Sequence, residues 1–274
     1  MYCAGTCSRG IKRGSMREDR TTSRLCVLAV PGGDRAAASC LAERLGISLH
    51  TDERGAEDAL IVRFDRDGVA LAADGMELRA DLSSMASRLR RGRLERELLV
   101  RAAKVKGVED PVAVDATAGF GEDSLLLAAA GFKVLLFEHD AVIAAMLRDA
   151  LRRAAEVPAL AEAASRMCLA GEGSVQGLAA LEASPDVVYL DPMFPERRKS
   201  AAVKKKFQLL HRLERPCDDE DALLRAAVAA GPRKVVVKRP VKGPFLAGVK
   251  PSYSLAGKAV RYDCIVPAQG GPAS

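Results

Sequence analysis

After Pro111 the chain repeats one pattern several times, a strand, a glycine turn and a helix, and this repetition leaves few folds open. Short apolar segments that alternate with helical stretches are typical of a parallel sheet with helices on both faces. The sequence therefore predicts an α/β fold with a doubly wound sheet. The candidate strands are 112–116, 133–138, 167–170, 187–190 and 234–238, and the candidate helices are 122–130, 141–155 and 219–230.

The C-terminal part adds two more candidate strands, 253–255 and 260–266. The short segment between them predicts a hairpin, because strands joined so directly are antiparallel. One strand of the sheet should therefore run against the others.

A small α+β unit precedes this sheet. Its apolar runs are separated by Asp67-Gly68 and Asp74-Gly75, which are typical turns of β-hairpins, and its helix should end at Gly46. We expect an antiparallel meander of three strands here. These strands are 60–64, 69–72 and 76–80.

Four segments follow from these patterns. The segment 1–24 carries six Arg or Lys without hydrophobic periodicity, so we expect it to be a disordered basic tail. Met16 in this segment could equally be the true start of the protein. The segment 83–110 shows apolar residues at helical spacing with many Arg between them, which predicts a basic helical stretch from Ser83 to Lys106. The segments are the tail, 1–24, a small N-terminal α+β domain, 25–82, a basic helical connector, 83–110, and the α/β domain, 111–268.

Composition narrows the class of protein. With 49% hydrophobic and 28% charged residues, the chain has the composition of a folded globular protein. It has no apolar stretch of the roughly 20 residues that a membrane span needs and no secretory signal, so we expect a cytoplasmic protein without a membrane partner. The seven Cys are scattered and lack metal-ligand spacing, so no metal is expected. The net charge of +6 favours a polyanionic partner.

The segment VAVDATAGFGEDS predicts a nucleotide-type site. An apolar strand ends in Asp115, and the following loop contains Gly119 and Gly121, which permit close approach of the backbone to a ligand. This loop lies at the carboxyl end of a strand, where open α/β sheets bind their ligands. The next strand ends in Glu138, which could accept hydrogen bonds from both hydroxyls of a ribose.

The residues after the glycine loop indicate which ligand this is. Ser124 stands where a dinucleotide site would prefer a third glycine, and Glu122 and Asp123 open the helix where pyrophosphate would bind. Two carboxylates at that point repel phosphate. S-adenosylmethionine (SAM) carries a ribose, an adenine and cationic groups but no phosphate, so the acidic pocket suits it as the cofactor.

A second motif follows the buried strand 187–190. Asp191-Pro192-Met193-Phe194 forms an Asp-Pro-x-aromatic turn at the carboxyl end of this strand. Asp191 could orient an exocyclic NH2 group, while the ring of Phe194 stacks on the flat base that carries it. The sequence therefore predicts methylation of an amine, with Asp191 and Phe194 as the catalytic residues.

Basic residues surround this turn and could bind the phosphate backbone of a nucleic acid. A solvated charged loop is the alternative. The candidate RNA-binding residues are Arg197, Arg198, Lys199, Lys204, Lys205, Lys206, Lys238 and Arg239.

At these motifs the chain resembles the bacterial 16S ribosomal RNA guanine-N2 methyltransferases, the type that modifies guanosine 1516 of the small-subunit RNA. The resemblance spans roughly 25–266, and its most specific parts are DATAGFGEDS, VVYLDPMFPERRKSAAVKK and KVVVKRP. It implies a Rossmann-like class I SAM-dependent methyltransferase sheet, with seven strands of which one is antiparallel, and a small N-terminal α+β domain. It also implies 16S rRNA or the small ribosomal subunit as the partner.

The resemblance further implies cofactor contacts in the loops that follow four strands. Positions 122 and 139 are commonly Arg in the family, whereas this chain has Glu and His there, so backbone contacts carry over more safely than side-chain roles. Together with Asp115, Gly119 and Gly121, the expected cofactor-binding residues are Glu122, Asp123, Glu138, His139, Gly173, Ser174 and Asp191.

The sequence-based hypothesis is transfer of a methyl group from SAM to the N2 amine of a guanosine in 16S rRNA. The Asp-Pro-x-aromatic turn also suits any other planar NH2, so methylation of DNA adenine or cytosine, or of a protein amide, stays open. A non-catalytic RNA-binding assembly factor is the alternative from another class. The sequence leaves the oligomeric state unknown.

Overall fold

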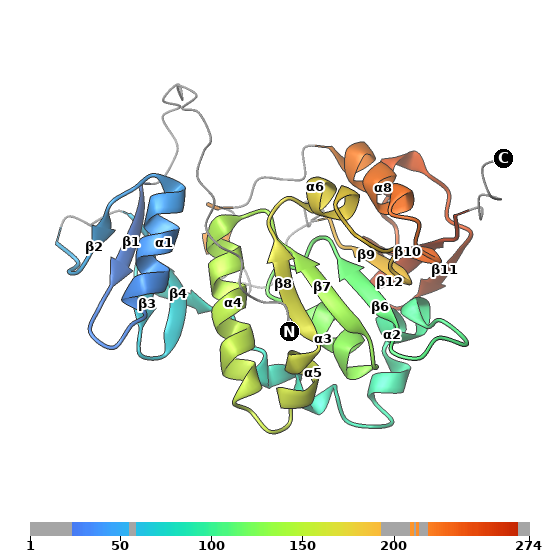
Figure 1. The fold of residues 1–274 in the computed structure, drawn as a ribbon, viewed down its shortest axis with the longest axis horizontal. Helices are drawn as coiled ribbons and strands as arrows, with labels where there is room; N and C mark the ends of the chain where they lie inside the picture. The colour runs from blue at the N-terminus through green and yellow to red at the C-terminus, as the bar shows by residue number, and fades with distance from the viewer. Residues whose placement is uncertain (1–23, 55–58, 193–208, 211, 214–218, 268–274) are drawn as a thin grey trace.

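The computed structural model describes residues 24–54, 59–192, 209–210, 212–213 and 219–267, which form two β-sheets with helices packed on them (Figure 1). The smaller sheet comes from the N-terminal part of the chain and has five strands, and the larger one has seven. The expected tail, 1–24, lies outside the described residues except for Arg24.

The five-stranded sheet has the order β2-β1-β3-β4-β5. Strands β3, β4 and β5 pair antiparallel, which confirms the predicted meander, and β1 pairs parallel with both β2 and β3. The helix α1 begins after Asp34, whose side chain accepts a hydrogen bond from the Ala37 backbone N–H, and ends at Gly46, which has a left-handed φ of 67°. The elements are β1 (Leu25–Ala29), α1 (Arg35–Leu45), β2 (Leu49–His50), β3 (Leu60–Asp65), β4 (Gly68–Ala73) and β5 (Met76–Arg79).

The seven-stranded sheet has the order β11-β12-β10-β9-β6-β7-β8. Strand β12 pairs antiparallel with both β10 and β11, and the other pairs are parallel, so the α/β fold class with one reversed strand is confirmed. The strands are β6 (Val112–Asp115), β7 (Lys133–Phe137), β8 (Met167–Gly171), β9 (Val187–Leu190), β10 (Lys234–Pro240), β11 (Tyr253–Ala256) and β12 (Val260–Ile265).

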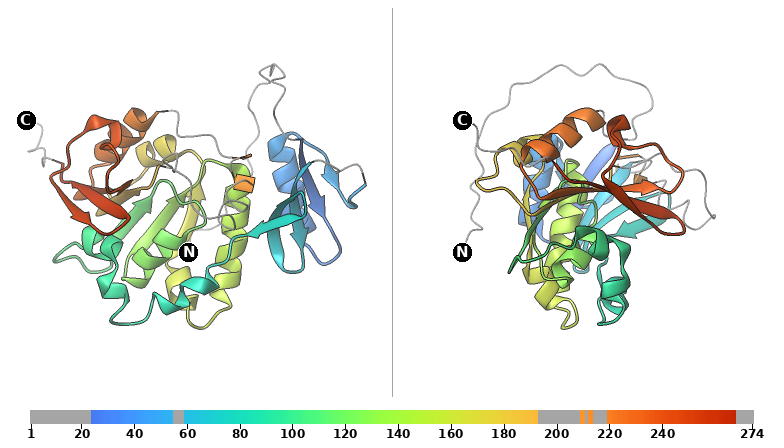
Figure 2. Two further views of the ribbon diagram at one scale, coloured as in Figure 1. Left: turned by 180° about the vertical axis from the view of Figure 1, so that it is seen from behind. Right: turned by 90° about the vertical axis from the view of Figure 1, so that its right-hand side faces the viewer.

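Helices cover both faces of this sheet (Figures 1 and 2). One face packs Tyr189 and Val236 against α2, α3, α4 and α5, and the other packs Val188 and Val235 against α6, α8 and η3. Alternate residues of one strand thus serve opposite cores, as the two-residue period of a strand requires. These helices are α2 (Leu98–Ala103), α3 (Glu122–Ala129), α4 (Ala141–Ala155), α5 (Ala161–Ser165), α6 (Ser174–Ala179), α8 (Glu220–Ala229) and the 3₁₀ turn η3 (Leu246–Gly248).

The connector between the sheets differs from its prediction. Instead of one helical stretch from Ser83 to Lys106, the chain forms two 3₁₀ turns, η1 (Ser83–Ser87) and η2 (Leu94–Arg96), and then α2. Gly92, with a φ of 83°, interrupts helical geometry between the two turns. Five arginines of this connector are exposed, at 90, 91, 93, 96 and 101.

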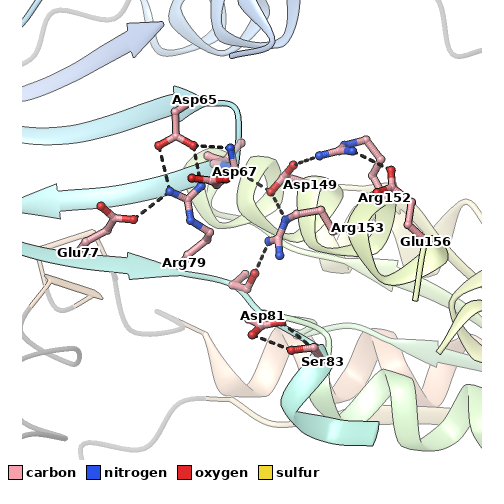
Figure 3. A network of polar contacts seen from close by, with 12 residues as sticks. Asp65, Asp67, Glu77, Arg79, Asp81, Ser83, Asp149, Arg152, Arg153 and Glu156 are labelled. Atoms are coloured by element: carbon pink, nitrogen blue, oxygen red, sulfur yellow. Dashed lines mark hydrogen bonds and ion pairs between the residues drawn. The ribbon is translucent and has the colours of Figure 1, made fainter. Parts of the chain in front are cut away.

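The two sheets share one hydrophobic core, and α4 joins them (Figures 1 and 3). Asp149 on α4 accepts hydrogen bonds from the backbone N–H of Val69 in β4, at 3.0 Å, and from Arg153 Nε, at 2.8 Å. Arg153 also donates to the carbonyl oxygen of Ala80. Gly68 has a φ of 111°, and a Cβ there would overlap the Asp149 carboxylate.

Candidate functional site

The loop between β6 and α3 has a backbone that requires glycine at two positions. Gly119 has a φ of 53° and Gly121 a φ of 79°, both in the left-handed region that favours glycine. A Cβ on Gly121 would also lie 2.8 Å from the Leu147 Cδ1 atom, so α4 leaves no room for a side chain. The loop turns tightly at the carboxyl end of β6, the edge where open α/β sheets bind ligands.

Asp115 supports this loop from below. Its carboxylate accepts hydrogen bonds from the Thr117 backbone N–H, at 3.0 Å, and from the Ser124 hydroxyl. Asp115 is only 1% exposed, and burial raises its pKa to about 7. The enclosed side chain of Asp115 therefore supports the glycine loop, and its contact with a cofactor stays a prediction.

Glu138 ties the same loop to the end of β7. One carboxylate oxygen accepts from the Gly119 backbone N–H at 2.8 Å, and the other accepts from the Asp140 backbone N–H at 2.9 Å. Glu138 is buried, which raises its pKa. Each carboxylate oxygen has a second lone pair, so Glu138 can hold the loop and still accept from a ribose. His139 lies 3.4 Å from Glu138 with its ring 61% exposed.

The loop after β8 joins this arrangement. The Ser174 hydroxyl donates to the carbonyl oxygen of Ala116 at 2.6 Å, which connects the start of α6 to the glycine loop. Gly173 precedes α6 and is exposed. The structure thus brings together the predicted residues that follow β6, β7 and β8 at one edge of the sheet.

Asp191 reaches this edge from β9, whose four residues are all buried. The Asp191 backbone N–H donates to the Thr117 hydroxyl at 2.6 Å, so the residue is fixed beside the glycine loop. Its side chain is 34% exposed. Asp191 is therefore anchored through its backbone and open to a partner through its carboxylate.

Lys238 on β10 forms ion pairs with two carboxylates of the site. Its Nζ lies 2.9 Å from Asp191 Oδ2 and 2.7 Å from Asp123 Oδ2. The same Asp123 oxygen accepts a hydrogen bond from the Tyr189 hydroxyl at 2.6 Å. Burial by itself would lower the pKa of Lys238, but the charges of Asp123 and Asp191 outweigh it and raise the pKa.

Two of the predicted RNA-binding residues, Lys238 and Arg239, have partners within the protein, and their contact with RNA stays a prediction. Lys238 points at the acids of the site and shares its charge with two carboxylates. Arg239 is 1% exposed, and its guanidinium donates to the Pro244 carbonyl oxygen and to Glu220. Because side chains alternate along β10, Lys238 and Arg239 belong to opposite sides of the sheet.

The remaining predicted residues differ in what the structure says of them. Glu122 is exposed in the first turn of α3, where the helix dipole stabilises acidic side chains without any ligand. The predicted catalytic and RNA-binding residues Phe194, Arg197, Arg198, Lys199, Lys204, Lys205 and Lys206 lie outside the described residues.

Sequence reasoning assigned no role to Thr117 or Tyr189, although both bond residues of the site. The signal was available for Tyr189, since a phenol in an otherwise aliphatic buried strand needs a hydrogen-bond partner. Thr117 gave no such signal, because its partner is a backbone N–H distant in sequence.

Two further properties bear on the class of site. In the parts of the chain that the structure describes, no His, Cys, Asp and Glu side chains gather in a group of three or more suited to a metal ion. No helix among the same residues has the length and the apolar run to cross a bilayer.

The donor set fits SAM. The edge presents the carboxylates of Asp123, Glu138 and Asp191 around a loop that needs glycine, and such a set favours a cationic ligand with a ribose over a phosphate-bearing one. Together with the single antiparallel strand, this site defines the class of SAM-dependent methyltransferases.

The comparisons with known proteins agree with this class. A family model described as "Putative SAM-dependent methyltransferase" matches residues 42–267. Ribosomal RNA small subunit methyltransferase J of Pseudomonas aeruginosa strain LESB58 is 41% identical over 252 residues, which cover 89% of this chain and 95% of the relative. The protein of the same name from Neisseria meningitidis serogroup C, strain FAM18, is 41% identical over 211 residues, or 76% of this chain and 84% of the relative.

A solved structure gives the same result. The crystal structure of a SAM-dependent methyltransferase from Neisseria gonorrhoeae superposes with a TM-score of 0.70 at 30% identity and covers 89% of this chain and 97% of that one. The chain belongs to the ribosomal RNA small subunit methyltransferase J family.

Proposed function

We propose that this chain transfers a methyl group from SAM to the exocyclic N2 amine of a guanosine in 16S ribosomal RNA. The observation that carries the proposal is the position of Asp191, because its backbone is held by Thr117 of the glycine loop and its carboxylate is open at the same edge. The names of the relatives from P. aeruginosa and N. meningitidis support ribosomal RNA of the small subunit as the substrate.

The cofactor supplies an electrophilic methyl group on a sulfonium. In the proposed reaction the bond from N2 to the methyl carbon forms as the bond from sulfur to that carbon breaks, and the amine then loses a proton to Asp191 or to water. An amine conjugated to a purine is weakly basic, so the protein has mainly to position it. Asp191 does this by accepting a hydrogen bond from the amine, which leaves the nitrogen lone pair facing the methyl group.

Glu138 and the glycine loop carry the cofactor side of the proposal. The carboxylate of Glu138 is held in place by two backbone N–H groups, at 2.8 and 2.9 Å, so it needs little reorganisation to accept from the ribose hydroxyls. The carboxylates at the start of α3 favour the cationic end of the cofactor. Contacts from His139, Gly173 and Ser174 are part of the same proposal.

The substrate side rests on residues beyond the described ones. We propose that Phe194 stacks on the target base, whose removal from its stack costs on the order of a few kcal/mol. The basic residues between 197 and 206 would then hold the phosphate backbone, and the small ribosomal subunit in the cytoplasm would be the partner.

The decisive experiment is methyl transfer from labelled SAM to small subunits from cells that lack this protein, followed by mapping of the labelled nucleoside. The proposal expects N2-methylguanosine at one site. Label on DNA, on a protein amide or on another base would contradict the proposal and identify a different amine as the substrate. Binding to subunits without label transfer, unaffected by SAM, would identify an assembly factor.

A further inference from the structure

The side chain of Lys238 is placed by three adjacent strands. Strand β10 pairs parallel with β9, where Val237 is opposite Leu190, and antiparallel with β12, where Lys238 is opposite Tyr262. This register sets Lys238 one residue further along the edge than the end of β9, level with Asp191. The ammonium group is therefore held by the sheet itself, and its side chain is 26% exposed.

We propose that Lys238 is a positioning residue that fixes the carboxylate of Asp191 for methyl transfer and that Asp123 competes with Asp191 for it. The inference rests on the proposed function, since it assigns Asp191 the task of orienting the amine. The geometry is a chain of contacts from Tyr189 through Asp123 and Lys238 to Asp191, with distances of 2.6, 2.7 and 2.9 Å.

Asp123 and Asp191 compete because two carboxylates pair with one ammonium group. Asp123 and Asp191 both bond one Lys238 ammonium through a single oxygen each, so neither has the cation to itself. Asp123 also accepts from Tyr189 and is the better-enclosed partner, with a side chain 19% exposed against 34% for Asp191. Asp191 thus keeps one oxygen beyond this pairing with which to accept from a substrate amine.

Other ionisable groups face this pair from every neighbouring element. From β6 the carboxyl of Asp115 interacts with both acids, and from β10 the guanidinium of Arg239 acts on Asp191. The phenols on β9 and β12 are Tyr189 and Tyr262, and burial raises the pKa of each. Arg88 from the connector interacts with Asp123 and Tyr262, and it is itself held by two hydrogen bonds to Glu97, each of 2.8 Å.

Burial and the neighbouring charges shift the pKa of Asp191 in different directions. Burial raises the pKa of Asp191, the charge and hydrogen bond of Lys238 lower it, and the negative charge of Asp123 raises it again. The net pKa is above the usual value of an aspartate. Because the amine needs a carboxylate acceptor, methyl transfer should decline as the pH falls through the pKa of Asp191.

In a plot of kcat against pH, the acidic limb is the range in which kcat declines as the pH falls. Two substitutions should move this limb in opposite directions. Lys238→Met removes the cation, so the limb should move to higher pH by about one unit or more, and the loss of kcat should shrink as the pH rises. Asp123→Asn removes the competing charge and should move the limb to lower pH. Lys238→Arg keeps the charge and should restore most of the wild-type limb.

Lys234 provides a matched control on the same strand and the same face. It donates to the carbonyl oxygens of Ala102 and Lys104, at 3.1 and 2.9 Å, rather than to acids of the site. Lys234→Met removes an equal charge from β10, and its rate profile should keep the wild-type limb. Thermal unfolding of each variant reports the folded fraction, so a loss of folded protein can be separated from a shifted limb.

The experiment measures kcat for methyl transfer to small subunits at saturating SAM from pH 5 to 9, for the wild type and these four variants. Opposite shifts for Lys238→Met and Asp123→Asn, with Lys234→Met unshifted, support the inference. A Lys238→Met enzyme that loses activity equally at every pH overturns it, because the lysine then has only a structural role. Absence of label transfer by the wild type at every pH would instead overturn the proposed function.

Discussion

Two networks of acidic and basic side chains lie on the two sheets, and they differ in their balance of charge. On the N-terminal sheet, Asp65 and Glu77 are shared by Arg63 and Arg79, two acids with two bases. Figure 3 shows Arg79 with these two acids. At the edge of the seven-stranded sheet, the acids Asp115, Asp123 and Asp191 interact with one another, and among the described residues Lys238 forms ion pairs with two of them.

The pKa values of the acids in the two networks shift in opposite directions. Burial alone would raise the pKa of Asp65, but hydrogen bonds from Arg79, Arg63 and the Asp67 backbone N–H lower it below its usual value. Burial raises the pKa of Asp115 and Asp191, and their hydrogen bonds and cations do not compensate for it. A matched network stabilises a fold, whereas an excess of buried acid is costly and is typical of a site that works on a ligand.

The largest expected effect is on catalysis, at the unmatched network. Asp191→Ala should lower kcat for methyl transfer by about 10³-fold, because the amine loses the acceptor that positions it. The affinity for S-adenosylhomocysteine, measured by calorimetry, should change less in this variant than in Glu138→Ala. Normal kcat for Asp191→Ala at saturating substrates would contradict the role of this carboxylate.

The second effect is the pH dependence that a buried acid imposes on stability. A folded-state pKa of about 7 for Asp115, above the unfolded value, means that the folded protein binds the proton more tightly, so stability should decline as the pH rises from about 4 to 7. In Asp115→Asn the amide oxygen can still accept from the Thr117 N–H, while the amide NH2 donates to the Ser124 hydroxyl oxygen instead of accepting from it. The variant should remove a cost on the order of 4 kcal/mol at pH 8. Denaturant unfolding at pH 5 and pH 8 measures this, and equal effects at both values would contradict it.

The third effect tests the joint between the two regions. Asp149→Ala removes the acceptor for Val69 and for two arginines on α4, so the free energy of unfolding should fall by about 2 to 3 kcal/mol. Methyl transfer per folded molecule should stay at the wild-type rate, because the hydrogen bonds of Asp149 go to Val69 of β4 and to arginines of α4 rather than to residues of the site. Urea unfolding and an activity assay on the same samples measure both quantities.

The smallest effect is expected at the matched network. Asp65→Asn keeps the oxygen that accepts from the Asp67 backbone N–H, but it loses the charge and the second oxygen, which accepts from Arg63 and Arg79. Because these side chains keep contact with solvent, the change should cost about 1 kcal/mol or less. Because the pKa of Asp65 is lowered, its contribution is present at neutral pH and is lost as the pH falls through that pKa. Wild type and variant should thus converge in stability in acid, and a larger cost of the variant at pH 3 than at pH 7 would contradict the sign.

Much of the fold could be predicted because short stretches of sequence determine its strands and helices. The strands of the seven-stranded sheet and the helix that ends at Gly46 follow from apolar runs and turn residues that lie close together in sequence. The connector could not be predicted in the same way. Its leucines and arginines recur at helical spacing, but the left-handed turn at Gly92 divides it, and packing decides which part becomes α2.

The site shows the same division. The position of Glu138 and Asp191 at the sheet edge could be predicted, because each follows a strand that leads to that edge. The partners of Lys238 and Arg239 within the protein could not be predicted, because adjacent basic residues look alike in a sequence while a strand turns their side chains to opposite faces. The contact of Lys238 with Asp123 joins residues 115 positions apart, and only the order of the strands brings them together.

The contact of Gly68 with Asp149 limits how this protein can be recombined with its relatives. A hybrid that takes its first 80 residues from one parent and the remainder from another unites a foreign turn with this α4. Unless the incoming turn also has glycine at that point, a methyl group would collide with the carboxylate that receives the Val69 N–H. Productive crossovers should therefore inherit β4 and α4 from the same parent.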